Sequence, residues 1–110
     1  MNITREQDTL AELALTSVLA STPAIPFGAY SAAVLVVPAS YASTSIDVYT
    51  AVDETDTFVP LKDASGNAVS FPVTASTAVV LPAACFPCRW LKLKSSADDS
   101  SRPATLIRKG

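Results

Sequence analysis

Short runs of alternating apolar and polar residues recur along this chain, and Asp, Ser, Gly, Asn and Pro separate them. The clearest run covers residues 45–52, where Ile46 and Val48 fall on one face of a strand and Asp47 and Tyr49 on the other. Short strands at close intervals are typical of antiparallel sandwiches and barrels. The pattern therefore predicts an all-β fold, a single antiparallel β-sandwich of the jelly-roll type with about seven or eight strands.

The other predicted strands are short apolar runs between turn residues. They cover residues 30–37, 58–61, 69–73, 78–81, 89–95 and 104–107. Gly66 and Asn67 readily adopt positive φ and therefore predict a hairpin turn. Residues 69–73 are then the hairpin partner of residues 58–61. The run at residues 33–37 is continuously apolar, which is typical of a strand buried on both faces.

The beginning of the chain fits two patterns. A capping box at residues 9–12, followed by apolar residues at helical spacing, favours a helix. The alternation of Ala11, Leu13 and Leu15 favours a strand instead. We favour the strand, because the rest of the chain predicts β-structure and a strand joins a sheet more easily. Residues 1–17 are also a candidate flexible or partner-binding arm.

The chain is short and its charge is unevenly placed. Its 110 residues predict one domain, residues 1–110, and a formal net charge of −2 provides no basic field to attract nucleic acid. Residues 13–46 contain no Asp, Glu, Lys or Arg. This segment is either a core strand pair with Ser- and Thr-rich loops or a dry contact with another subunit, because interface centres are depleted in charge. The candidate contact residues in it are Leu13, Leu15, Val18 and Leu19.

No segment resembles a membrane span or a secretory signal. The apolar runs are far shorter than the roughly 20 residues that cross a bilayer. The N-terminal sequence shows no basic region followed by an apolar one. We therefore expect folding in a reducing cytosol, where structural disulfides are rare.

The sequence lacks the residue types and motifs that most often carry out catalysis. It has no histidine, and its three glycines lie too far apart to form a phosphate-binding loop. No Gly-x-Ser-x-Gly nucleophile motif is present. We therefore expect a protein that is not an enzyme, that needs no cofactor or metal, and that functions through its surfaces.

Two clusters invite a metal or redox interpretation. Cys85 and Cys88 could form a redox pair or half of a zinc site shared between subunits, but neither a βαβ pattern nor further ligands accompany them. We favour free thiols that pack in a loop. Asp53, Glu54 and Asp56 could bind calcium, yet their spacing fits no EF-hand loop, and a solvated turn is favoured.

The strand that contains the tryptophan has two different faces. Leu91 and Leu93 share one face and should point into the core. Trp90, Lys92 and Lys94 share the opposite face and are candidate partner-interface residues. Trp90 either covers a neighbouring loop or anchors a partner, because tryptophan is enriched at interface hot spots.

Four turn and strand motifs follow one another, at residues 46–49 (IDVY), 57–67 (TFVPLKDASGN), 79–83 (VVLPA) and 89–95 (RWLKLKS). Their order resembles small β-sandwich virion proteins of tailed bacteriophages. The resemblance implies a virion structural protein, and within that class a capsid decoration or cement protein that stabilises the lattice of the major capsid protein. The acidic cluster and the cysteine loop depart from the pattern of this group.

The same resemblance implies partners and a location. The partner would be the major capsid protein, with a homo-oligomer on the capsid surface of the virion after assembly in the host cytoplasm. Nucleic acid and membranes are not expected partners. The alternatives are a neck, tail or fibre accessory module, or a carbohydrate-binding module on a fibre. Candidate sugar-stacking residues in the last case are Tyr30, Tyr41, Tyr49 and Trp90.

Overall fold

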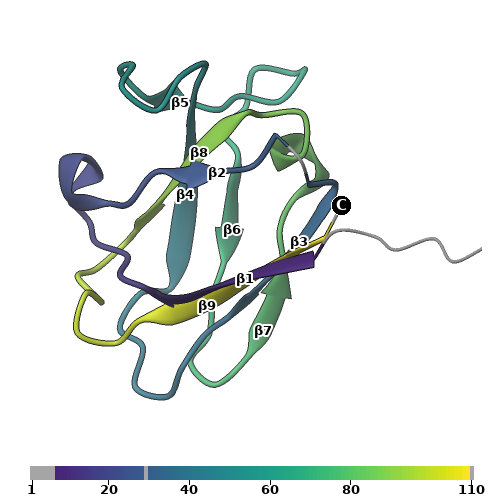
Figure 1. The fold of residues 1–110 in the computed structure, drawn as a ribbon. Helices are drawn as coiled ribbons and strands as arrows, with labels where there is room; N and C mark the ends of the chain where they lie inside the picture. Colours follow the sequence, from purple (N-terminus) through teal and green to yellow (C-terminus); the bar gives the residue numbers. More distant parts are fainter. Residues whose placement is uncertain (1–6, 29, 110) are drawn as a thin grey trace, which may run out of the picture.

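Two antiparallel β-sheets pack face to face in the computed structural model, which describes residues 7–28 and 30–109 (Figure 1). The strands are β1 (Gln7–Leu13), β2 (Ile25–Pro26), β3 (Ala32–Val36), β4 (Ser45–Ala51), β5 (Val59–Pro60), β6 (Ser70–Pro72), β7 (Ala78–Val80), β8 (Trp90–Ser95) and β9 (Ala104–Lys109). Two 3-10 helices are η1 (Leu19–Ser21) and η2 (Ala83–Cys85). Within the described residues, no helix has the length and apolar character needed to cross a membrane.

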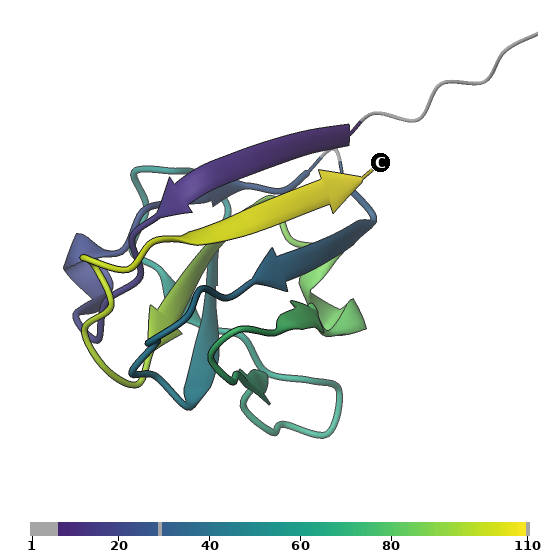
Figure 2. The same cartoon turned by 90° about the horizontal axis from the view of Figure 1, so that it is seen from below.

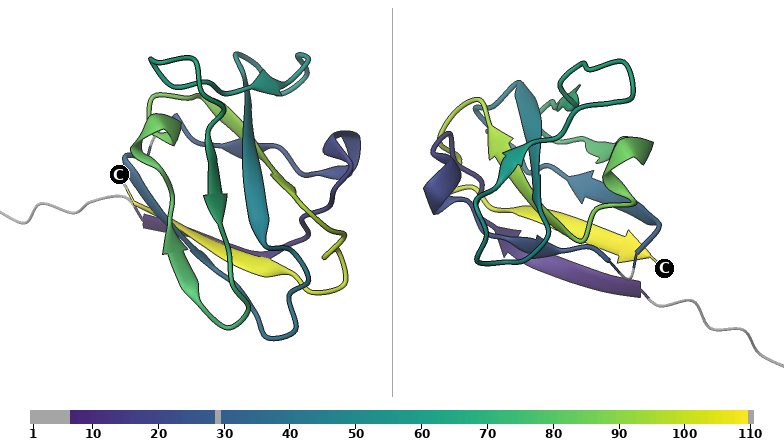
Figure 3. Two further views of the ribbon diagram at one scale, coloured as in Figure 1. Left: turned by 180° about the vertical axis from the view of Figure 1, so that it is seen from behind. Right: turned by 90° about the horizontal axis from the view of Figure 1, so that it is seen from above.

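The strand order is that of a jelly roll. Sheet A has the order β1-β9-β3-β7, and sheet B has the order β2-β8-β4-β5, with β6 also paired to β4. Successive strands cross from one sheet to the other, except that β5 and β6 both follow β4 within sheet B. Figure 3 shows the two layers from behind and from above. The predicted antiparallel sandwich is confirmed. The described residues form nine strands, and the one that the sequence did not predict is the two-residue edge strand β2.

The turn between β5 and β6 forms as predicted, but its arms pair only beside the turn. The Asp63 N–H donates to the Asn67 carbonyl over 2.8 Å, and Gly66 has a φ of 83°. The arms then meet only at a bridge between Lys62 and Ala68, and β5 and β6 each pair with a different part of β4. The predicted hairpin is therefore only partly formed: the Val69 N–H donates to the Leu61 carbonyl over 2.9 Å, and the arms separate beyond that bond. Each arm contains a proline, which has no N–H for a ladder, whereas β4 offers a longer edge.

The beginning of the chain is a strand and not a helix. β1 pairs with β9 from Gln7 opposite Lys109 to Leu13 opposite Ala104, with a register shift between Leu10 and Leu13. Leu13 is 6% exposed, and Leu15, just beyond the strand, is 0% exposed. A strand wins over a helix here because pairing with β9 brings these leucines into the core.

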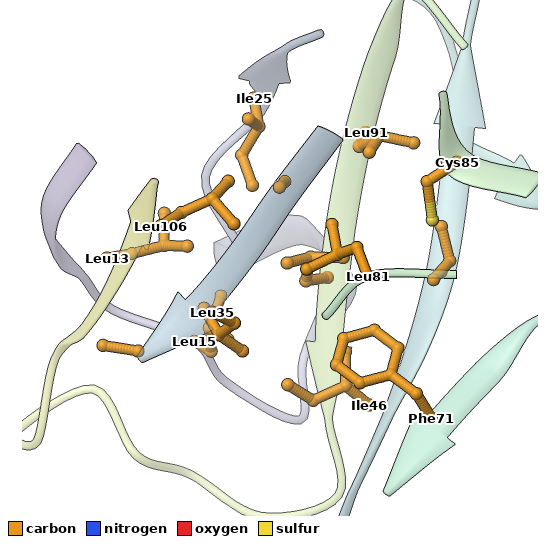
Figure 4. Close-up of a cluster of buried hydrophobic side chains, with 14 of the residues drawn as sticks. Leu13, Leu15, Ile25, Leu35, Ile46, Phe71, Leu81, Cys85, Leu91 and Leu106 are labelled. Carbon is orange, nitrogen blue, oxygen red and sulfur yellow. The ribbon is translucent and has the colours of Figure 1, made fainter. Parts of the chain in front are cut away.

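The core lies between the two sheets (Figure 4). Leu35 and Leu106 from sheet A meet Ile46, Leu91 and Leu93 from sheet B, and all five side chains are fully buried. Burying each such side chain stabilises the fold by about 1.5–3 kcal/mol. The period-two alternation along β4 and β8 therefore decides which side of sheet B faces inward.

A buried cation ties the two sheets together. Arg108, on the inward side of β9, is 2% exposed, and its Nη1 donates to the carbonyl of Pro26 on β2. Its guanidinium carbon lies 4.4 Å from the ring centre of Tyr30. Arg108 therefore links an inner strand of sheet A to an edge strand of sheet B.

A buried carboxylate fixes the loops at one end of the sandwich. Asp99 accepts hydrogen bonds from the N–H groups of Ala42 and Ser43 over 2.8 and 2.9 Å, from the Ser43 hydroxyl, and from Arg102 Nε over 3.0 Å. Burial by itself would raise the pKa of Asp99, but these hydrogen bonds outweigh it and hold the pKa below its usual range. Asp99 thereby joins the segment that enters β4 to the turn between β8 and β9.

Candidate interaction surfaces

The outward side of sheet B carries the tryptophan and both lysines that the sequence singled out. We call this surface face B. Its members are Asp47, Tyr49, Ala51, Trp90, Lys92 and Lys94. In the register of β4 and β8, Trp90 lies opposite Ala51, Lys92 opposite Tyr49, and Lys94 opposite Asp47. Burial alternates along β8 as expected, since Leu91 and Leu93 are fully buried and the three face B residues are partly exposed.

Lys92 is held by contacts within the chain. Its Nζ donates to the Leu19 carbonyl of η1 over 3.3 Å and lies 4.9 Å from the ring centre of Phe58. Phe58 is 7% exposed, although it lies outside the main core cluster. Lys92 therefore lies over the Phe58 ring and connects η1 to sheet B.

Trp90 lies in the middle of a row of small side chains. Its register partners are Ala51 on β4 and Pro26 on β2. Neither side chain is long enough to cover an indole ring, and Trp90 remains partly exposed. The arrangement leaves part of the ring available as an anchor for a partner, and whether a partner uses it stays a prediction.

The candidate contact residues near the N-terminus lie in different surroundings. Leu13 and Leu15 pack within the chain's own core, so their side chains are occupied by intramolecular contacts. Leu19 is partly buried, and Val18 is 57% exposed. Val18 borders an open cavity of about 340 Å³ whose other lining residues are Ala14, Thr16, Ser17, Ser21, Asp98 and Ser100. Of this set, Val18 offers the most apolar surface to a partner.

The outward side of sheet A is a surface that the sequence analysis did not select. We call it face A. The outward residues that the registers give are Thr9, Ala32, Val34, Val36, Ala78, Val80, Thr105, Ile107 and Lys109. Seen from below, sheet A is the nearest layer, and no other described element crosses in front of β9 and β3 (Figure 2). Two exposed valines stand out, since Val36 is 39% and Val80 is 69% exposed. The continuously apolar run at residues 33–37 could have indicated this surface. Its outward residue Val34 is partly exposed and Val36 is exposed, so no second layer of the chain fully covers them.

The cysteine loop favours packing over reactivity. Cys85 is fully buried in η2, and burial, together with the neighbouring Cys88, raises the pKa of the Cys85 thiol to about 12. Cys88 is partly exposed, and its thiol donates to the Ala84 carbonyl over 3.8 Å. Both cysteines are free thiols. A thiol with a raised pKa is a poor nucleophile and a poor metal ligand at neutral pH.

The acidic residues after β4 lie in an exposed turn, which the Asp56 N–H closes on the Asp53 carbonyl over 3.2 Å. The described residues contain no group of three or more His, Cys, Asp or Glu side chains arranged to hold a metal ion. Asp56 instead borders an open cavity of about 530 Å³ at this end of the sandwich. Its lining residues are Thr50, Ala51, Val52, Asp56, Thr57, Val59, Pro87, Cys88 and Arg89.

Of the four aromatic candidates for sugar stacking, Tyr49 and Trp90 share one face, and Tyr30 and Tyr41 lie elsewhere. Tyr41 is 7% exposed, and burial together with the charge of Asp99 raises its pKa to about 12. The ring of Tyr30 lies under the Arg108 guanidinium. Tyr49 and Trp90 lie on face B, and none of the four lines the 530 Å³ cavity.

Comparison with known proteins finds a relative in structure only. No protein-family model matches the chain, and no curated protein sequence matches it. The chain is similar to the crystal structure of the SPBc2 prophage-derived protein YomS, with a TM-score of 0.60 and 11% sequence identity. The match covers 100% of this chain and 98% of YomS. The two proteins share a fold.

Proposed function

We propose that this protein is a virion structural protein of a tailed bacteriophage that decorates the capsid by binding the assembled lattice of major capsid protein. Support comes from the motif order in the sequence and from the full-length fold similarity to a prophage-derived protein. Proteins that share a fold often differ in function, so the proposal has to rest on the surfaces.

The observation that carries the proposal is face B. It presents a partly exposed tryptophan beside Lys92 and Lys94 on a regular strand, at positions fixed by the buried Leu91 and Leu93. Lys92 is engaged within the chain, so Trp90 and Lys94 are the side chains of this strand that face B leaves for a partner. An aromatic ring and a cation on one face are suited to a protein surface that carries acidic groups. Face B is therefore the surface that we assign to the capsid.

The function follows from linkage and requires no chemistry. A partner that binds only the assembled lattice stabilises that lattice by about 2.7 kcal/mol when its free concentration is a hundred times its Kd. In this proposal the protein is not an enzyme, and its location is the outer capsid surface. The high pKa of Cys85 agrees with a role in packing.

The test uses heads of the phage that encodes the chain, prepared without this protein. Purified protein should sediment with the heads saturably and should raise the temperature at which they release DNA. Unassembled capsid subunits are the control, and binding to them should be much weaker. Binding to tails or fibres with no binding to heads would contradict the proposal.

A carbohydrate-binding module on a fibre is the second candidate. The observation that favours it is the open cavity of about 530 Å³, which has the size of a small-molecule site and combines the Asp56 carboxylate with the Arg89 guanidinium. The aromatic stacking that such modules use is absent from its lining. Glycan binding that Arg89→Ala abolishes, without binding to heads, would favour this candidate.

A further inference from the structure

One turn of the backbone brings the two cysteines together. The Cys88 N–H donates to the Cys85 carbonyl over 3.2 Å, which closes a β-turn at the end of η2. The first and fourth Cα atoms of a β-turn lie within about 7 Å of one another. Disulfide bonds join Cα atoms that are usually about 4.4–6.8 Å apart. The backbone therefore holds the two cysteines at a separation that a disulfide bond can span.

Both cysteine side chains pack against the core. Cys85 belongs to the buried core cluster, and Cys88 is a partly buried residue that packs against the same cluster. The charge of an ionised Cys88 raises the pKa of the Cys85 thiol, as expected of sulfur atoms that lie near one another. The Cys88 thiol donates a weak hydrogen bond to the Ala84 carbonyl over 3.8 Å. That bond does little to hold the thiol away from Cys85.

Only one of the two thiols can be reached from solvent. Cys88 is partly exposed and lines the open cavity of about 530 Å³, whereas Cys85 is 0% exposed. In redox-active cysteine pairs, an accessible cysteine meets the oxidant and a second cysteine beside it completes the disulfide bond. Oxidation of this pair must therefore begin at Cys88.

We propose that Cys85 and Cys88 form an intramolecular disulfide bond when the folded protein meets a small oxidised disulfide such as oxidised glutathione. The Cys88 thiol loses its proton to solvent, and its sulfur attacks one glutathione sulfur. The glutathione disulfide breaks, one glutathione leaves, and a mixed disulfide remains on Cys88. The Cys85 thiol then loses its proton, its sulfur bonds to the Cys88 sulfur, and the second glutathione leaves. The two cysteines lose two electrons, and the two departing glutathiones take up the two protons.

The turn geometry and the burial act on different aspects of this exchange. Because both thiols belong to one turn, the second step is intramolecular and benefits from a high effective concentration. Burial raises the pKa of Cys85 to about 12, so few Cys85 thiolates are present at neutral pH and the second step is slow. The mixed disulfide on Cys88 should therefore accumulate before the cross-link forms. A reducing glutathione pool keeps both thiols free, and an oxidising environment favours the cross-link.

The cross-link acts on one wall of the 530 Å³ cavity. Pro87, Cys88 and Arg89 line that wall, and they connect η2 to β8. A bond to Cys85, which is fixed in the core, ties this segment to the core at a further point and so limits its movement. The inference does not depend on the proposed function, since oxidation is measured on the purified chain without heads.

The experiment incubates the purified, fully reduced chain with oxidised glutathione at neutral pH, and it follows the number of free thiols and the intact mass over time. The wild type should pass through a single glutathione adduct. It should end with no free thiol, no adduct, and a mass lower by that of two hydrogen atoms. Excess dithiothreitol should restore both thiols. A parallel incubation in urea shows how the unfolded chain reacts.

Two variants separate the two steps. Cys85→Ala keeps an apolar side chain in the core and should stop at a stable glutathione adduct on Cys88. Cys88→Ser should leave the buried Cys85 thiol free, with a reaction at least about tenfold slower than the first step in the wild type. Melting temperatures show that each variant is folded, and if Cys85→Ala does not fold, Cys88→Ser and the wild type decide.

Three results would overturn the proposal. The first is a folded wild type that keeps two free thiols, and the second is one that stops at the glutathione adduct. The third is a disulfide bond that joins two chains, or that forms only in urea, where both thiols are exposed.

Discussion

Faces A and B are the outward sides of two sheets of one sandwich, and they follow different rules. On face B, aromatic, cationic and acidic side chains alternate with buried residues along β4 and β8. On face A, the outward residues of β3 and β7 are small or β-branched and apolar, so β3 does not alternate in polarity at all. The comparison shows that a strand with alternating apolar and polar residues exposes its polar side to solvent. A strand that is apolar on both sides exposes apolar side chains unless another layer packs against it.

The charges also differ in how they are used. Lys92 on face B is engaged by η1 and by Phe58, whereas Lys94 lies across from Asp47. Face B thus combines residues that maintain the fold with residues that remain available to a partner. On face A, Val80 is 69% exposed, so its side chain contributes little to the packing of one chain.

The largest expected effect is a loss of folding stability, which affects both faces together. Asp99→Ala should lower the free energy of unfolding by about 3 kcal/mol, because it leaves the buried N–H groups of Ala42 and Ser43 without their acceptor. Chemical denaturation measures this loss. Head binding should then fall in proportion to the folded fraction, and a loss beyond that fraction would break the comparison.

The same carboxylate predicts a pH dependence. The pKa of Asp99 is lower in the folded state than the unfolded value of about 3.9, so its contribution to stability is fully present above that pH. The contribution is lost as the pH falls through the lowered folded pKa. The wild type should therefore lose more stability than Asp99→Ala below about pH 4. Parallel acid denaturation curves for the two proteins would contradict this role.

A smaller effect separates two lysines of face B. Lys92→Glu should lower the free energy of unfolding by about 1–2 kcal/mol, because it removes the hydrogen bond to Leu19 and the contact with Phe58. Lys94→Glu is the matched control and should cost about 0.5 kcal/mol or less, as a like charge opposite Asp47. Equal losses in urea denaturation would show that Lys92 has no special structural part.

The smallest effect concerns residues outside both faces. Cys88→Ser should change the free energy of unfolding by about 0.5 kcal/mol or less and should leave head binding as it is. In the wild type, a thiol reagent at neutral pH should label Cys88 well before Cys85, because Cys85 is buried and has a pKa of about 12. Rapid labelling of both thiols would contradict the packing role.

The parts of the fold that could be predicted are those where the alternation of apolar and polar residues by itself shows which side of a strand is buried. The alternation of Ile46 and Val48, and of Leu91 and Leu93, identifies two inner strands and their inward sides. The turn at residues 63–67 follows from Gly66 and its neighbours. The pairing of its arms with β4 could not be predicted in this way, because a competing long-range edge decides it.

The surfaces and buried polar groups were harder to predict. Asp98 and Asp99 are adjacent in a polar turn, and only long-range contacts with Ala42 and Ser43 make the second a buried anchor. An uncharged segment likewise does not reveal what covers it. Leu15 is covered by the chain's own core, and Val36 is left exposed. The apolar run of β3 predicted burial on both faces of the strand, and within the chain only the inward face is buried.

The most direct test of the account measures head binding for two variants, Trp90→Ala and Val80→Lys. Trp90→Ala should weaken head binding by about 2 kcal/mol or more. Val80→Lys should leave the affinity of each folded chain for heads unchanged, because Val80 lies on face A. Denaturation of both variants corrects for folding, since loss of a core side chain would cost about 3–5 kcal/mol of stability. Equal effects of the two variants on head binding, or no effect of either, would contradict the assignment of face B to the capsid.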